Sequence, residues 1–300
     1  MIISSLLSLY IASIINPDFE AVPAYTNSGF ASVLNIDLGN ILSEKSVPVK
    51  KAAYISPIIS PKSAIAVDND TGAILFEKNA DEKRPIASIT KLMTILIILD
   101  ENELSDTVTV SSNAASSGGS TMFLHTGEKI AVENLIYGAL IGSSNDAAIA
   151  LAEHNAGSTT EFIKKMNKKA KDLKLTNTHF STSSGLGDTD NYSSARDLSK
   201  LARQVYKNKF IQHAAELKEI EVLSNDGSVT HKIKTTNELL GGYLNVKGLK
   251  TGTTDAAGQC LVTIAENEGG HEITTVLLHS PDRFTEAKIL IDWVFRAFNW

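Results

Sequence analysis

The chain has 300 residues, which is enough for one large domain or two smaller ones. Apolar residues make up 43% and charged residues 21%, as in a globular protein rather than a disordered chain. The formal net charge of -6 argues against a nucleic-acid partner. The single cysteine, Cys260, excludes an internal disulfide and a cysteine-rich metal site. It lies in the apolar run 260–264, and we interpret it as a buried strand residue.

Residues 1–24 are predicted to form a secretory signal peptide or an N-terminal anchor. Residues 2–15 are apolar over the length of a signal peptide and are too few to span a membrane comfortably. Small residues follow at 21–24, but no Lys or Arg precedes Lys45, so the usual positive flank is missing. An amphipathic extension is the alternative. We therefore expect an extracytoplasmic protein, secreted, periplasmic or on the cell-wall side of the membrane.

The next stretch, 25–61, is expected to be a linker because Ser, Asn, Pro and Lys occur in it without a clear period. A short helix is expected within it at 34–42. The main domain is expected at 62–300. It should begin with strands at 63–67 and 73–77, because the residues between these apolar stretches have hairpin-turn chemistry.

The middle of the domain is predicted to be mainly helical. The apolar run after Ser88 predicts a helix that ends near Asp100. Further helices are expected at 132–155 with a break at 142–145, at 160–173, and after Ser194, which should cap its helix; a strand is expected at 107–110 and loops at 111–120 and 181–192.

The last part of the chain returns to strands and closes with a helix. Strands are expected at 219–223, 229–233, 258–266 and 272–279, and the closing helix at 284–298. Strands at both ends with helices between them predict an α+β fold. In it, an antiparallel sheet is formed from both ends of the domain and a helical region is inserted.

The first chemical motif is S-x-x-K at Ser88 and Lys91. On a helix these positions share one face, so the lysine amine should lie beside the serine hydroxyl and could take its proton. The positive end of the helix would also favour an oxyanion. The alternative is an exposed Ser and Lys at the start of a buried helix, because a lone S-x-x-K is common by chance.

Two further motifs follow. Ser143 and Asn145 interrupt a helical pattern, where a hydroxyl could relay a proton and a carboxamide could hold a peptide backbone. The alternative is a helix cap. Lys250-Thr251-Gly252 is expected to open a strand, where the lysine and hydroxyl could bind a carboxylate and the glycine would allow a close approach. If Lys250 lies near Lys91, its charge would lower the Lys91 pKa. The alternative is a turn entering a strand.

S-x-x-K, S-x-N and K-T-G in this order are the signature of class A β-lactamases and penicillin-binding proteins. The contexts at 87–94, 143–147 and 248–252 more closely resemble the low-molecular-weight penicillin-binding proteins of the D-alanyl-D-alanine carboxypeptidase family. Segments at 179–180, 185–186, 192–198 and 255–262 are similar to that family as well, and the resemblance covers about residues 62–298. It implies the β-lactamase/transpeptidase-like fold.

The resemblance also implies a role for each motif residue. Ser88 would be the acylated nucleophile, Lys91 its base, and Ser143 the donor of a proton to the leaving D-alanine. Asn145 would bind the substrate backbone, and the backbone N–H groups of Ser88 and Thr253 would form the oxyanion hole. The residues implied in contact with the substrate's terminal carboxylate and backbone are Lys250, Thr251, Gly252 and Arg283. For Arg283 the alternative is the cap of a surface helix.

The implied activity is that of a serine DD-carboxypeptidase that removes the terminal D-alanine from peptidoglycan stem peptides through an acyl-enzyme. It would act in cell-wall biosynthesis and remodelling, and β-lactams would be covalent inhibitors. No metal or organic cofactor is expected, since His125, His154, His179 and His231 lack zinc-ligand spacing. The sequence ends at Trp300, before the second domain and anchor of many relatives, so membrane contact is expected only through the N-terminal segment.

Several alternatives stay open. A class A β-lactamase needs a glutamate to activate the deacylating water, and the comparable stretch 176–191 has none, which argues against rapid β-lactam hydrolysis. A DD-endopeptidase or transpeptidase is compatible with the same motifs. A non-catalytic peptidoglycan-binding protein would be favoured by loss of the Ser88, Lys91 or Lys250 side chain, and all three are present. Ser144 stands where the family usually has Gly, and Thr253 where it often has His or an aromatic residue.

Overall fold

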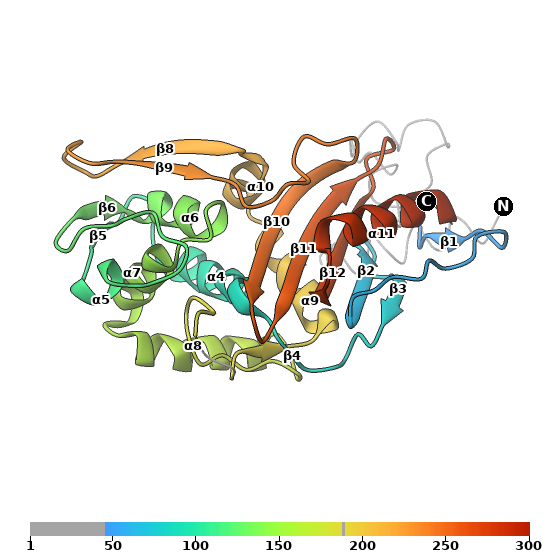
Figure 1. The fold of residues 1–300 in the computed structure, drawn as a ribbon, viewed down its shortest axis with the longest axis horizontal. Coiled ribbons are helices and arrows are strands. Elements are labelled where there is room, and N and C mark those ends of the chain that lie inside the picture. Colours follow the sequence, from blue (N-terminus) through green and yellow to red (C-terminus); the bar gives the residue numbers. More distant parts are fainter. Residues whose placement is uncertain (1–45, 188–189) are drawn as a thin grey trace, which may run out of the picture. The chain divides into compact units, whose positions relative to one another are not determined.

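A computed structural model describes residues 46–187 and 190–300 (Figure 1). Its main sheet has five antiparallel strands in the spatial order β10-β11-β12-β2-β3. Their bounds are Asn245–Thr254, Gly258–Glu266, Glu272–Ser280, Ser63–Asp68 and Ile74–Lys78. Strand β12, late in the chain, pairs with β2 so that Val276 lies opposite Ile65. The predicted α+β fold, with an antiparallel sheet from both ends of the domain, is confirmed.

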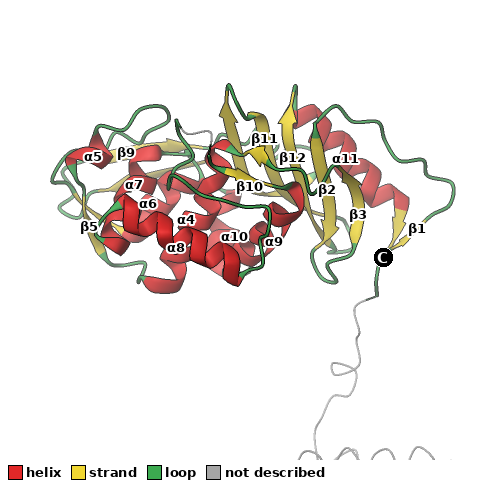
Figure 2. Cartoon of the chain, turned by 90° about the horizontal axis from the view of Figure 1, so that it is seen from below, coloured by secondary structure: helices red, strands yellow, loops and turns green. Residues whose placement is uncertain are grey.

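Helices cover both faces of this sheet (Figure 2). Helix α9, Ala195–Tyr206, packs against β12 and β2, and helix α11, Arg283–Ala297, packs against β11 and β12. Successive side chains of a strand point to opposite faces, and this alternation divides β2 between the two cores. Ile65 and Val67 join the core that contains α9, whereas Ala64 and Ala66 join the core that contains α11.

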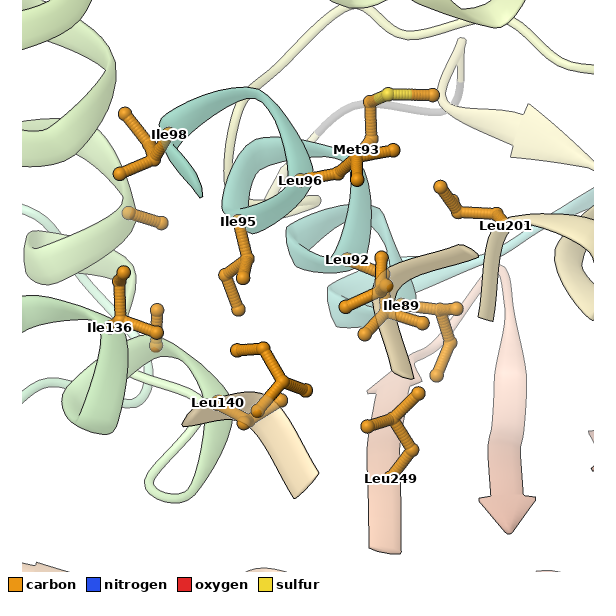
Figure 3. Packing of buried hydrophobic residues seen from close by; sticks show 14 of the residues in the cluster. Ile89, Leu92, Met93, Ile95, Leu96, Ile98, Ile136, Leu140, Leu201 and Leu249 are labelled. Carbon is orange, nitrogen blue, oxygen red and sulfur yellow. The ribbon is translucent and has the colours of Figure 1, made fainter. Parts of the chain in front are cut away.

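The inserted region is built around helix α4, Lys91–Glu101. Its residues from Lys91 to Ile98 are all buried, because a helix that is apolar on every side must be surrounded by other elements. It is packed against α6 (Val132–Leu140), α7 (Asn145–Ala156), α8 (Thr159–Asp172) and α9. Figure 3 shows its side chains between those of α6 and α9, with Leu249 of β10 near its first turn. The start of α4 therefore lies where the helices meet the sheet.

Shorter elements complete the described residues. They are the 3-10 turn η1 (Ala87–Thr90), helices α5 (Ser112–Ala115) and α10 (Lys209–Glu216), and strands β1 (Val49–Lys50), β4 (Arg84–Pro85), β5 (Thr107–Thr109), β6 (Lys129–Ala131), β7 (Tyr192–Ser193), β8 (Glu219–Leu223), β9 (Thr230–Lys234) and β13 (Phe298–Asn299). They form two-stranded pairs β1-β13, β4-β7, β5-β6 and β8-β9.

The break between α6 and α7 and the cap of α9 by Ser194 are confirmed. Other expectations are wrong. Helix α5 interrupts the loop predicted at 111–120, because the Ser111 hydroxyl accepts a hydrogen bond from Ala114 N and caps a short turn. Helix α10 was not predicted. Strand β10 begins at Asn245, so Lys250 lies within the strand and does not open it.

The predicted signal or anchor at 1–24, the helix at 34–42 and the start of the linker lie outside the described residues. The remainder of the predicted linker, 46–61, contributes β1, in which Val49 pairs with Asn299. Among the residues described, no helix has the length and apolar character that a membrane crossing requires.

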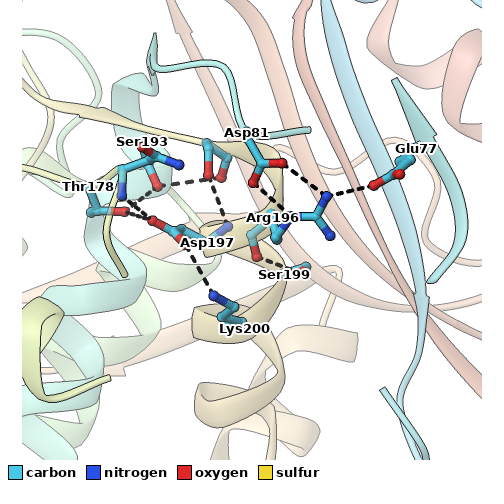
Figure 4. A network of polar contacts seen from close by, with 10 residues as sticks. Glu77, Asp81, Thr178, Ser193, Arg196, Asp197, Ser199 and Lys200 are labelled. Carbon is cyan, nitrogen blue, oxygen red and sulfur yellow. Dashed lines mark hydrogen bonds and ion pairs between the residues drawn. The ribbon is translucent and has the colours of Figure 1, made fainter. Parts of the chain in front are cut away.

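A polar network holds the chain segment that leads to Ser88 (Figure 4). Arg196, in the first turn of α9, donates hydrogen bonds to Asp81 at 2.7 Å and to Glu77 at 2.6 Å. The bond from Arg196 to Asp81 holds the pKa of that carboxyl below its usual value. The Arg196 N–H also donates to Ala80 O at 2.9 Å. The loop after β3 is thus tied to α9 immediately before it turns towards Ser88.

Candidate active site

The Ser88–Lys91 pair lies where η1 runs into α4. Ser88 Oγ is 2.9 Å from Lys91 Nζ, the contact that their spacing predicts. Ser88 is partly exposed, whereas Lys91 is completely buried. A substrate can therefore reach the hydroxyl while the amine remains shielded from water.

Two backbone positions shape the turn before Ser88. Ala87 has a φ of 49°, in the left-handed region that few non-glycine residues adopt. Gly185, with a φ of 79°, lies against it, and a Cβ at Gly185 would stand only 2.0 Å from Ala87 O. Only glycine fits at this position, so the loop that carries it can support the Ser88 turn.

Lys91 Nζ has two other oxygen partners, Asn145 Oδ1 and the carbonyl of Ser184, each at 2.7 Å. Both are carbonyl oxygens and can only accept a hydrogen bond. A neutral amine would give its two N–H groups to them, and its lone pair would then face Ser88 Oγ. This is the arrangement that a general base for a serine hydroxyl requires.

The electrostatic surroundings favour that neutral form. Burial, and then the charge of Lys250, hold the pKa of Lys91 well below its usual value, while the nearby Asp146 opposes this shift. The charge of Lys250 therefore lowers the Lys91 pKa, as the sequence analysis expected if the two lysines were close.

The second motif occupies the break between α6 and α7. Ser143 has a φ of 59°, and its Oγ accepts a hydrogen bond from Lys250 Nζ at 2.8 Å. Ser144 stands at the N-cap position of α7, but its side chain makes no capping bond. The helix-cap alternative thus does not account for either serine, and the Ser143 hydroxyl is directed to the third motif.

Asn145 is the first residue of α7 and is buried. Its Oδ1 accepts from Lys91, and its Nδ2 donates to Gly118 O at 2.8 Å. Both ends of the carboxamide are therefore bonded within the protein, where they orient the Lys91 amine. Its role towards a substrate backbone stays a prediction.

The third motif lies on β10, an edge strand of the main sheet. Lys250 and Thr251 are buried, with exposed fractions of 1% and 4%, whereas Thr253 is exposed. A Cβ at Gly252 would come within 3.1 Å of Ser88 N, so the strand passes directly beside the Ser88 turn. An edge strand with glycine at this point can accept an extended peptide close to the nucleophile.

Arg283, at the start of α11, reaches the same strand. Its Nη1 donates to Gly252 O at 3.1 Å and to Thr253 Oγ1 at 2.5 Å. Burial, and then the charge of Arg283, lower the pKa of Lys250 to about 7. Two basic side chains, Lys250 within β10 and Arg283 from α11, therefore lie along this strand beside Ser88, which suits an anionic ligand.

The sequence analysis missed several groups of the site. Asp146 is buried and accepts hydrogen bonds from Met122 N and Leu124 N, each at 3.1 Å. The only available signal was its place directly after the S-x-N motif. The carbonyls of Ser184 and Gly118 gave no signal at all, because every residue carries one.

Cys260 lies in β11 and is completely buried, and burial raises the pKa of its thiol to about 11. Its interpretation as a buried strand residue is confirmed. Within 46–187 and 190–300, no three His, Cys, Asp or Glu side chains are grouped as a metal site would require.

Comparisons with known proteins agree with this geometry. The profile of the D-alanyl-D-alanine carboxypeptidase family matches residues 50–281. The chain is 37% identical over 245 residues to the D-alanyl-D-alanine carboxypeptidase DacF of Bacillus subtilis, covering 79% of this chain and 63% of that protein. It is 39% identical over 260 residues to DacC of Escherichia coli, covering 81% of this chain and 63% of that protein. The chain thus spans just under two thirds of the length of these two carboxypeptidases.

A solved structure extends the comparison to the fold. The Streptomyces K15 DD-transpeptidase superposes with a TM-score of 0.76 at 33% identity, covering 81% of this chain and 99% of that one. The sheet and helices described above are thus those of a DD-peptidase fold. Because the family profile matches most of the chain, the chain belongs to the D-alanyl-D-alanine carboxypeptidase family.

Proposed function

We propose that this chain is a serine DD-carboxypeptidase that removes the terminal D-alanine from peptidoglycan stem peptides in cell-wall biosynthesis and remodelling. The observation that carries the proposal is the contact of Ser88 Oγ with a buried Lys91 amine whose other two partners are carbonyl oxygens. Membership of the family supports the same reaction.

Acylation follows from this contact. Lys91 takes the proton of Ser88, and Ser88 Oγ attacks the carbonyl carbon of the penultimate D-alanine. The N–H groups of Ser88 and Thr253 are proposed to stabilise the oxyanion, and the close approach of Gly252 to Ser88 N supports this role. The developing charge would then be held by donors that are already in place.

Ser143 is proposed to pass a proton to the nitrogen of the leaving D-alanine as the tetrahedral intermediate collapses. Its hydroxyl accepts from Lys250 and is therefore free to donate in the opposite direction. Ser143 receives in exchange the proton that Lys91 took from Ser88, so Lys91 is neutral again. Water then attacks the acyl carbon and gives a proton to Lys91, which passes it to Ser88 Oγ as the ester bond breaks and the shortened peptide leaves. This restores the starting state without a cofactor.

The free carboxylate of the terminal D-alanine is proposed to bind near Lys250, Thr251 and Arg283. The two cations lie close enough for Arg283 to lower the pKa of Lys250, and a bound carboxylate would relieve that repulsion. A carboxypeptidase must recognise this group, since it distinguishes a chain end from an internal peptide bond.

Lys250→Ala should weaken acylation by ligands with a terminal carboxylate about 10- to 100-fold, as expected for loss of a charge-assisted hydrogen bond. The same peptides with a C-terminal amide should lose much less. Because the pKa of Lys250 is about 7, the parent should bind the carboxylate more weakly as pH rises through 7, when the amine loses its charge. The variant should lack this dependence.

The matched control is Lys247→Ala, which removes a lysine of the same strand that is paired with Glu216 and Glu266. It should leave acylation nearly unchanged. Rates are measured by competition with a fluorescent penicillin across pH. Equal losses for the acid and the amide would remove the proposed role of Lys250.

The function itself is tested by three assays on the full chain. They are release of D-alanine from a pentapeptide ending in D-Ala-D-Ala, transfer of the acyl group to an added amino acid, and turnover of a chromogenic β-lactam. A carboxypeptidase should release D-alanine rapidly, transfer little and turn over the β-lactam slowly. Rapid β-lactam turnover without D-alanine release would contradict the proposal.

Transpeptidation is the second candidate function. Its support is the likeness to the Streptomyces K15 DD-transpeptidase. Endopeptidase activity would use the same acylation steps on a different peptide. A β-lactamase is less favoured, because residues 176–191 contain no glutamate to activate water.

We also propose an extracytoplasmic location, since peptidoglycan lies outside the cytoplasm and residues 1–24 have the apolar character of a signal or anchor. Residues 62–300 would be the catalytic domain, and residues 25–61 would join this domain to the signal or anchor. β-Lactams are expected to act as covalent inhibitors at Ser88.

A further inference from the structure

Phe123 is a bulky aromatic residue that the fold keeps at the surface. Its exposed fraction is 79%, and its φ of 62° lies in the left-handed region. That backbone conformation costs free energy for a large side chain, and the exposed ring buries too little apolar surface to offset the cost. Such a residue lowers stability at its position, and strained positions of this kind gather at functional sites.

Its two neighbours explain why the ring is turned outward. Met122 and Leu124 are each 4% exposed, and both N–H groups donate to the carboxylate of Asp146 at 3.1 Å. Asp146 is itself 1% exposed. One buried carboxylate thus fixes the backbone on both sides of Phe123 while both flanking side chains enter the core.

The same loop borders the catalytic residues. Asn145, which precedes Asp146, donates its N–H to Ser120 O at 2.7 Å and its Nδ2 to Gly118 O at 2.8 Å. Phe123 lies three positions after Ser120, so their Cα atoms are within about 11 Å of each other. Phe123 therefore lies on the loop that is bonded to Asn145, whose Oδ1 accepts from Lys91 beside Ser88.

We propose that Phe123 is a specificity-determining contact for the part of the substrate that precedes D-Ala-D-Ala. The inference rests on the proposed function, since it needs a peptide bound at Ser88. An aromatic face can pack against the aliphatic side chain and the planar amide of that preceding residue. The acylamino side chain of a penicillin occupies the corresponding place in a β-lactam.

The test compares ligands with and without this preceding group. The pairs are benzylpenicillin against 6-aminopenicillanic acid, and an N-acylated tripeptide ending in D-Ala-D-Ala against acetyl-D-Ala-D-Ala. Phe123→Ala should reduce acylation by the longer ligand of each pair about tenfold and leave the shorter one nearly unchanged. Phe123→Tyr, which keeps the ring, should stay close to the parent.

Tyr243→Ala is the matched control. Tyr243 is an aromatic residue with an exposed fraction of 75%, next to the start of β10 at Asn245. Five strand positions, about 16 Å, separate Asn245 from Lys250. This variant should leave acylation by both ligands unchanged.

A purely structural role for Phe123 makes a different prediction. Phe123→Asn places a residue that tolerates the left-handed backbone at the same position, and its melting temperature should be no lower than that of the parent. A clear fall would indicate that the ring stabilises the fold and would overturn the inference. Equal losses for long and short ligands in Phe123→Ala, or no loss for either, would overturn it as well. A parent that forms no adduct and releases no D-alanine overturns the proposed function, and this inference with it.

Discussion

Ser88→Ala should abolish both the covalent penicillin adduct and the release of D-alanine. The acyl group is proposed to form on Ser88 Oγ, and alanine leaves nothing at this position that Lys91 can activate. The fold should be retained, because the substitution removes a small, partly exposed hydroxyl and its one described hydrogen bond, to Lys91. The adduct is measured by intact mass and by fluorescence in a denaturing gel, and the fold by melting temperature.

Ser184→Ala is the matched control for this result. Ser184 contacts Lys91 through its backbone carbonyl, which alanine keeps. Among the described residues its hydroxyl accepts a single 3.3 Å bond, from Leu186 N, so the variant should still be labelled. An adduct that persists in Ser88→Ala would mean that another residue is acylated, and the proposed reaction would have to be rebuilt.

Lys91→Arg should lower the acylation rate about 10³-fold, which lies within the range for loss of a general base. Arginine is permanently charged and does not lose its proton in this pH range, so, unlike the neutral Lys91 amine, it offers no lone pair to Ser88. In the parent, acylation should fall as pH drops through the pKa of Lys91, because the protonated amine cannot accept a proton. Burial and the charge of Lys250 lower that pKa, so the decline should occur well below the pH expected of an ordinary lysine.

This pH dependence separates a base from a merely positive group. Lys91→Gln removes the charge and the base together, and it should be as slow as Lys91→Arg. Lys165→Ala, on the exposed face of α8, removes a lysine paired with Glu101 and should match the parent. If Lys91→Arg kept both the rate and the acid decline of the parent, Lys91 would not be the base.

Much of the fold could be predicted because its strongest signals are local. The apolar run from Leu92 to Ile98 required a buried helix, and the small residues at 142–145 predicted the break before α7. The start of β10 was missed, since Gly248 interrupts its pattern and the strand is defined by its pairing with β11. Helix α10 has few residues and depends on packing against α9 and β10.

The candidate site shows the same division. Ser88, Lys91, Ser143 and Lys250 could be found because their side chains carry the chemistry and their spacing is distinctive. The second and third partners of Lys91 could not, since one is a backbone carbonyl and the other is a carboxamide that was assigned to the substrate. Contacts of this kind depend on tertiary structure.

The pairing of β12 with β2 has a consequence for the time at which the candidate site can form. The Ser88 turn is made early in synthesis, but β10 and α11, which carry Lys250 and Arg283, follow only after most of the domain has emerged. Contacts between such distant segments form late and slowly. While the chain is still being synthesised, Ser88 therefore lacks its neighbouring strand β10, and the candidate site is assembled only when the final strands close the sheet.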